Sequence, residues 1–141
     1  DPHESLHDAL RREVAEETGA EIQPLVQAPS ASNDWREQVR EMIERRAKAF
    51  EFIMPFKVQA NARLLQSDFL QEKHRCAVES DIARLQTVVP KEVRADDALF
   101  QALAAAISFD VWRRLRVDQH RTPEQAMQAV RRPVGALLAQ A

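Results

Sequence analysis

The stretch DDALFQALAAAISFDVWRRLRVDQ, residues 96–119, decides the fold class because it predicts a helix that is apolar on two sides. Its apolar residues recur at intervals of three or four, which is the period of an α-helix. One row consists of Phe100, Leu103, Ile107, Val111 and Leu115, and a second row consists of Ala102, Ala105, Ala106, Phe109 and Trp112. Several neighbours are needed to cover such a wide apolar surface, so we expect this helix to pack inside a bundle.

Helical spacing continues upstream of this stretch. We expect a first helix over about residues 4–22 and a long helix from Trp35 that ends or kinks at Pro55. A short helix should follow this proline, and Ser67 or Asp68 should cap the next one. No segment alternates convincingly between apolar and polar residues at a period of two, as strands do. We therefore predict an all-α fold, a helical bundle of about five to six helices.

The last helix has a strong start signal. Thr122 stands at the N-cap, Pro123 at the first helical position and Gln125 three residues after the cap, which predicts a capping box. Pro133 interrupts the pattern, and we expect a kink near Ala129. Because both closing helices have wide apolar faces, we expect them to form a dimeric four-helix bundle with those of a second copy.

Composition narrows the class of protein further. The 141 residues are 45% apolar and 30% charged, which is typical of a globular domain, and only two are glycine. Phosphate-cradling loops need more glycine than this. The formal net charge of −2 predicts no general nucleic-acid surface. A single cysteine, Cys76, excludes an internal disulfide. No apolar run approaches twenty residues, so we expect no membrane contact and a cytoplasmic location.

The stretch SFDVWRRLRVDQHRTPEQAMQAVRRPVGALL, residues 108–138, resembles the C-terminal end of tetracycline-repressor (TetR) family regulators. The residues that carry the resemblance are Ser108, Phe109, Trp112, Leu115, Arg116, Gln119, Pro123, Glu124, Ala126, Leu137 and Leu138. The segment ERRAKAFEFIMPFKVQA, residues 44–60, is similar to the middle of the same domain, where a helix ends at a proline after aromatic residues. The resemblance covers about residues 34–140.

The resemblance implies a ligand-responsive transcriptional regulator that is a homodimer and not an enzyme. Residues 1–30 would be a connecting helix and loop, and residues 31–141 the effector-binding and dimerisation domain. The family's N-terminal helix-turn-helix is missing from this chain, so operator DNA would be bound only through that missing part. The expected effector is a small apolar or amphipathic molecule, and no cofactor or metal is expected.

The family places its ligand cavity among the middle helices. The expected ligand-binding residues are Phe50, Met54, Phe56, His74, Val78 and Trp112. His74 lies on an apolar stripe, where it could anchor an effector or could be a core histidine bonded to a neighbour. The bulky residues around Pro55 could equally fill a core. The expected dimer interface consists of Leu103, Ala106, Phe109, Met127, Val130, Val134 and Leu137.

Arginines cluster in the second half of the quoted stretch. Arg113, Arg114 and Arg116 could bind phosphate, but a solvated rim paired with acids such as Asp110 and Asp118 is the more ordinary interpretation.

A second resemblance concerns the acidic N-terminal segment. Glu4, Arg12, Glu13, Val14, Glu16, Glu17, Gly19 and Ile22 fall close to the box of Nudix hydrolases, which bind Mg²⁺ and cleave diphosphates. However, those enzymes build the box into a mixed sheet, and no strands are predicted here. We therefore favour a solubilising helix face over catalysis. A purely structural helical dimer is a third hypothesis.

Overall fold

The computed structural model describes residues 30–141, all of whose regular elements are helices. In chain order the elements are α2 (Trp35–Ala62), η1 (Leu64–Gln66), α3 (Asp68–Val88), α4 (Lys91–Ala95), α5 (Asp97–Ala106), α6 (Phe109–Arg113), η2 (Arg114–Asp118) and α7 (Pro123–Gln140). The predicted all-α bundle is thereby confirmed. The predicted helix over residues 4–22, with the Nudix-like carboxylates, lies outside the described residues.

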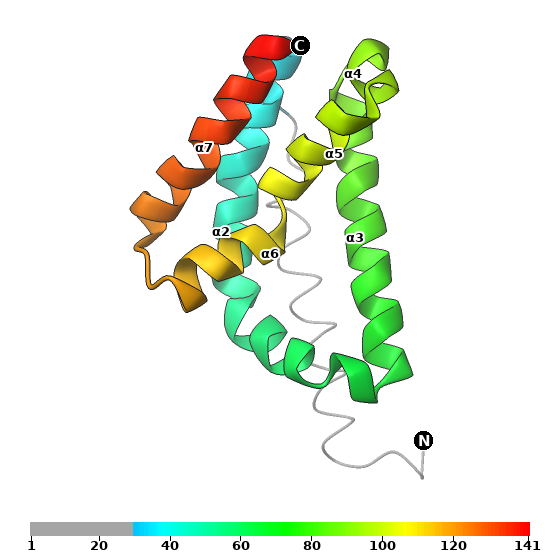
Figure 1. Ribbon diagram of the computed structural model, residues 1–141, viewed down its shortest axis with the longest axis vertical. Coiled ribbons are helices and arrows are strands. Elements are labelled where there is room, and N and C mark those ends of the chain that lie inside the picture. Colours follow the sequence, from blue (N-terminus) through cyan, green and yellow to red (C-terminus); the bar gives the residue numbers. More distant parts are fainter. Residues whose placement is uncertain (1–29) are drawn as a thin grey trace.

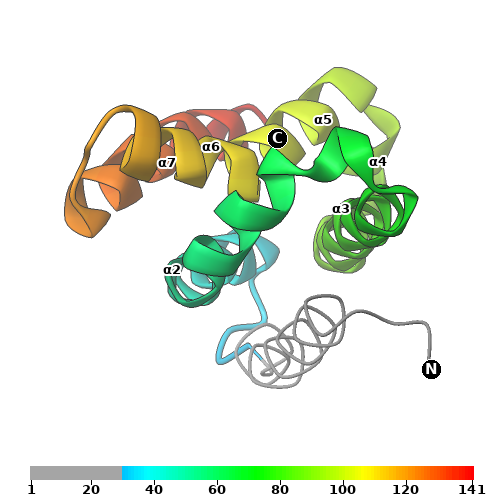
Figure 2. The ribbon, with the colours of Figure 1, turned by 90° about the horizontal axis from the view of Figure 1, so that it is seen from below.

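Three long helices set the shape of the molecule. In Figure 1, α7 runs beside the first half of α2 and α3 stands on the other side, while Figure 2 shows α5 and α6 forming a layer with α7 on one face of α2 and α3. The chain end is fastened to the start of α2, because the Arg36 guanidinium donates to the carbonyl oxygens of Leu138 at 3.2 Å and Ala141 at 2.6 Å. Seen from below, the end of α2 and η1 lead across to the start of α3 (Figure 2).

The α2 helix follows the apolar stripe that the sequence predicted. Val39, Ile43, Ala47 and Phe50 are buried at intervals of three or four. Pro55 does not end the helix. It lies inside α2, which bends in its second half and continues to Ala62 (Figure 1). The separate short helix expected after Pro55 is therefore part of α2, followed by the 3₁₀ turn η1.

The helix predicted over residues 96–119 is wrong as a single element. It divides into α5, α6 and the π-helix η2, with the first break at Ile107. Ser108 takes an extended conformation, and its hydroxyl accepts a hydrogen bond from the Val111 N–H at 3.3 Å. Its side chain thus starts a new helix, and the two helices meet different neighbours, α5 contacting α3 and α7 and α6 contacting α2.

Two predicted helix starts are confirmed. The Ser67 hydroxyl accepts from the Leu70 N–H at the start of α3. At the start of α7, Thr122 and Gln125 form a capping box, each side chain bonding the other's backbone N–H. The helix then continues through Pro133, which is exposed.

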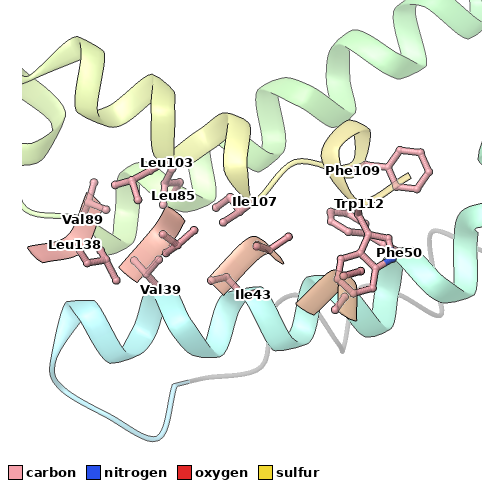
Figure 3. Packing of buried hydrophobic residues seen from close by; sticks show 14 of the residues in the cluster. Val39, Ile43, Phe50, Leu85, Val89, Leu103, Ile107, Phe109, Trp112 and Leu138 are labelled. Atoms are coloured by element: carbon pink, nitrogen blue, oxygen red, sulfur yellow. The ribbon is translucent and has the colours of Figure 1, made fainter. Parts of the chain in front are cut away.

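The core lies where α2 faces α5, α6 and α7. Figure 3 shows Val39 and Ile43 of α2 opposite Leu103 of α5 and Ile107 at its C-cap, with Leu138 of α7 beside them. From α3 only the last turns reach this core, since Leu85 is its single buried residue. The helices are thus joined tightly at one end of α3 and more openly at the other.

Candidate functional site

The six residues expected to bind a ligand do not line one pocket. Phe50, Met54 and Trp112 are in the hydrophobic core. Phe56 and Val78 are exposed, at 44% and 41%. His74 is partly buried on α3 and faces a different space from the other five.

This space is an open groove of about 380 Å³. It is lined by Val58, Ala62, Leu64, His74, Asp110 and Arg113. The first three come from the end of α2 and from η1, His74 comes from α3, and the last two come from α6. Its size falls in the range of small-molecule sites in proteins, roughly 300–1,000 Å³. It is therefore the candidate functional site among residues 30–141.

One wall of the groove is apolar because of the bend in α2. Val58 and Ala62 follow Pro55 on the helix, and Leu64 stands in the 3₁₀ turn that ends it. None of the three belongs to the core cluster, so their apolar surface is available to a ligand.

His74 contributes a polar group that no hydrogen bond within the described fold accounts for. Its Nδ1 atom is buried and has no hydrogen-bond partner among the described residues. A buried polar atom without a partner costs free energy, typically about 1–3 kcal/mol. This nitrogen is closed off from solvent, so a ligand in the groove would bond it, and recover that energy, after a rotation of the imidazole ring. The core-histidine interpretation, which requires a neighbouring partner, has no support among the described side chains.

The α6 helix supplies the charges of the groove. Asp110 and Arg113 are three residues apart, so they lie on the same face of the helix. The Arg113 Nη1 atom pairs with Asp118 at 3.3 Å, as the rim interpretation predicted, and with 32% of its side chain exposed it stays open to solvent. Arg116 instead pairs with Glu51 on α2 and holds η2 against that helix.

Lys57 adds a cation beside this face. Its ammonium lies 4.9 Å from the centre of the Phe109 ring. Burial lowers the pKa of Lys57, while the negative charges of Asp81 and Asp110 act in the opposite direction. The ammonium and Asp110 therefore attract each other across the join between α2 and α6.

The groove combines polar and apolar groups. It offers one imidazole, one carboxylate and one guanidinium beside an apolar wall, an arrangement that orients an amphipathic molecule. Within residues 30–141 no three histidine, cysteine or acidic residues are grouped to hold a metal ion. Sequence analysis considered Arg113 only as a phosphate-binding or rim residue and Asp110 only as a rim acid, because a straight helix over residues 96–119 gave them no reason to face His74.

Phe50 and Trp112 line a second and much smaller cavity. Its volume is about 10 Å³, and its other lining residues are Ile43, Arg46, Ala47, Ala106, Ile107, Ser108 and Val130. This is space for about one water molecule, so no effector fits there.

The residues predicted for the dimer interface are divided between core and boundary. Leu103, Phe109, Val130 and Val134 are buried in the chain's own core. Ala106, Met127 and Leu137 are partly buried and pack against it. These apolar rows are therefore largely covered within a single chain, so their coverage does not by itself require a second copy. Pairing itself stays a prediction.

Comparison of this chain with protein-family models, with curated proteins and with solved structures found no match. In the described part of the chain, no helix is both long and apolar enough to cross a membrane.

Proposed function

We propose that this chain is the effector-binding and dimerisation part of a TetR-like transcriptional regulator, and that the groove beside His74 is its effector site. The observation that carries the effector site is the buried Nδ1 of His74, unpartnered among the described residues, in a groove of about 380 Å³ with an apolar wall. The regulator assignment rests on the sequence resemblance over residues 34–140.

The proposed effector is a small amphipathic molecule. Its apolar part would contact Val58, Ala62 and Leu64, and its polar part would bond His74. Asp110 and Arg113 carry opposite charges, so they favour an effector with a dipole over one with a single strong charge. An effector that binds one arrangement of α2, α3 and α6 better than another would shift the protein toward that arrangement.

The proposed homodimer uses the outer faces of α5 and α7, since their inner faces are already in the core. Ala105 on α5 and Ala129 and Ala136 on α7 are exposed. Ala129 and Ala136 are seven residues apart and share one face of the helix. Side chains this small let two helices approach closely. Met127 and Leu137, which are partly buried, would lie at the border of this contact.

The effector site is tested with a neutral amphipathic dye of large dipole moment, 6-propionyl-2-(dimethylamino)naphthalene, as the probe. Ala62→Trp places a large side chain in the groove from an exposed position. We expect at least a fivefold loss of dye affinity in a fluorescence titration, because the ring occupies the apolar wall. The matched control is Ala83→Trp, at an exposed position on α3 that does not line the groove.

A second groove variant, His74→Leu, keeps the apolar bulk and removes the imidazole. It should lower the affinity for polar amphiphiles more than for apolar compounds of the same size. Equal dye binding by the wild type and both groove variants would reject the groove as the effector site.

The dimer is tested by sedimentation velocity. Ala129→Glu puts a charge on the outer face of α7 and should shift the protein from dimer to monomer without unfolding it. Ala83→Glu, on the exposed side of α3, should leave the dimer intact. A wild-type protein that sediments as a monomer at every concentration would overturn this part of the proposal.

A further inference from the structure

Two buried donors face the small cavity between α2, the α5–α6 break and α7. The side chain of Arg46 is 4% exposed and that of Trp112 is 3% exposed. Arg46 Nε and Trp112 Nε1 have no hydrogen-bond partner among residues 30–141. Both residues line the cavity of about 10 Å³, and Figure 3 shows Trp112 beside Phe50 at this place.

Arg46 is the one charged residue that is fully buried in the described part of the chain. Its Nη1 atom donates to the carbonyl of Ile107 at 3.3 Å, and its Nη2 atom donates to the carbonyl of Asp81 at 2.9 Å. The guanidinium is therefore held by backbone oxygens of two other elements. Burial lowers the pKa of Arg46, and the charge of Asp81 opposes this effect.

The cavity also offers acceptors. The Ile107 carbonyl has a second lone pair beyond the one that Arg46 uses. The Ser108 hydroxyl, which lines the same cavity, donates to the Ala105 carbonyl at 2.7 Å, and its oxygen accepts from the Val111 N–H.

We propose that this cavity is the site of one bound water molecule, which accepts hydrogen bonds from Arg46 Nε and Trp112 Nε1 and donates to the Ile107 carbonyl. Three such bonds are the usual number for a buried water. This site lies outside the groove and does not depend on the proposed effector.

The size of the cavity and the charges around it exclude other small ligands that could accept hydrogen bonds from Arg46 and Trp112. A carboxylate or a phosphate is several times larger than the space. A halide ion would satisfy the two donors and the charge of Arg46, but it would lie against the lone pairs of the Ile107 carbonyl and is larger than water. Water alone fits the volume and uses both kinds of partner.

The bound water would join α2 to the break between α5 and α6. Trp112 and Arg113 are neighbours on α6, so fixing the indole also fixes the helix that presents Asp110 and Arg113 to the groove. The water is thus a positioning element for α6.

The test is nuclear magnetic resonance on the full ¹⁵N-labelled chain, whose two tryptophans give two indole N–H signals. Trp112→Phe assigns the signals. We expect the Trp112 indole proton to show a nuclear Overhauser effect and a rotating-frame effect with water that have opposite signs, as a long-lived water gives. Trp35, which is partly exposed, serves as the internal control and should show the same-sign effects of mobile surface water.

Arg46, the second proposed hydrogen-bond donor to the water, is tested with Arg46→Met, which should abolish the opposite-sign effect at Trp112. The control Arg40→Met, at an exposed position of the same helix, should leave this effect unchanged. The wild-type spectrum decides the matter if Arg46→Met does not fold. Same-sign effects at Trp112, or no effect, would overturn the proposal. So would a saturable shift of the Trp112 signal with chloride or bromide at constant ionic strength, because a halide would then occupy the site.

Discussion

At the residue scale, two cations on α2, Arg46 and Lys57, are wholly or partly buried in environments that the sequence does not indicate. In the sequence, Arg46 and Lys57 look like ordinary solvated residues of an amphipathic helix. In the structure, Arg46 bonds two backbone carbonyls in the core, and Lys57 lies against the Phe109 ring. The pKa of each group is lowered, first of all by burial. Neither environment can be read from spacing along one helix.

Lys57→Met tests the cost of burying the ammonium. Because burial lowers the folded-state pKa of Lys57 below its ordinary value of 10.5, the native protein loses this proton before the unfolded chain does as pH rises. Wild-type stability should therefore gain from this group as pH approaches 10.5, whereas Lys57→Met should lack the gain. At pH 7 the variant should be at least as stable as the wild type.

Urea denaturation between pH 7 and pH 10 measures both effects. Lys48→Met, an exposed position on the same helix, is the control and should follow the wild type. A variant whose pH dependence is indistinguishable from that of the wild type would show that the Lys57 pKa is not lowered.

Capping decides where the elements begin. Ser67 and Thr122 were identified as caps from the sequence because each precedes a helix after a stretch of loop. Ser108 was overlooked because apolar helical spacing runs straight through it. A serine in mid-helix is ambiguous, since its hydroxyl can cap a new helix or bond the preceding turn. Here it does both, donating to the Ala105 carbonyl while accepting from the Val111 N–H.

Gly135→Ala should stabilise α7 by about 0.5–1 kcal/mol, because glycine inside a helix costs that much in backbone entropy. A β-carbon at this position meets nothing within 4 Å, and the backbone does not have a positive φ. Ala136→Gly, at the next position of the same helix, should lose a similar amount. Chemical denaturation of both variants measures the difference, and destabilisation by Gly135→Ala would mean that a neighbour not described here fills this space.

At the scale of the whole molecule, burial is uneven. One core joins α2, α5, α6 and α7, and from α3 only Leu85 is buried within it. The end of α2, η1 and the start of α3 leave large apolar residues exposed, among them Leu65 of η1 at 92% and Phe69 of α3 at 53%. The groove lies at this loosely packed end, where a ligand could change the spacing of helices without disrupting the core.

Two leucine-to-alanine substitutions, one in the core and one at the exposed end, test this uneven burial. Leu103→Ala removes a fully buried side chain and should cost about 3 kcal/mol of unfolding free energy. Leu65→Ala removes the same atoms from a position that is 92% exposed and should change stability by less than about 0.5 kcal/mol. Denaturant titrations report both values. Similar losses for the two variants would contradict the arrangement of α5 in the core.

The fold class and the starts of α2, α3 and α7 could be predicted from the sequence, because helical periodicity and caps are local properties. The apolar rows of α2 and α7, the Ser67 cap and the Thr122 capping box needed no knowledge of neighbours. Of the candidate site, only His74 was identified in this way. Its position on an apolar stripe marked it as unusual, but the stripe did not show what the imidazole faces.

Only the tertiary structure decided which partners these local features meet. It placed the apolar residues of α5 and α7 in one core with those of α2, so they are largely covered within one chain. It broke the helix at Ser108 and brought Asp110 and Arg113 opposite His74. The physical reason is that spacing along a helix specifies which side chains share a face. The element that covers this face depends on the packing of segments far apart in sequence.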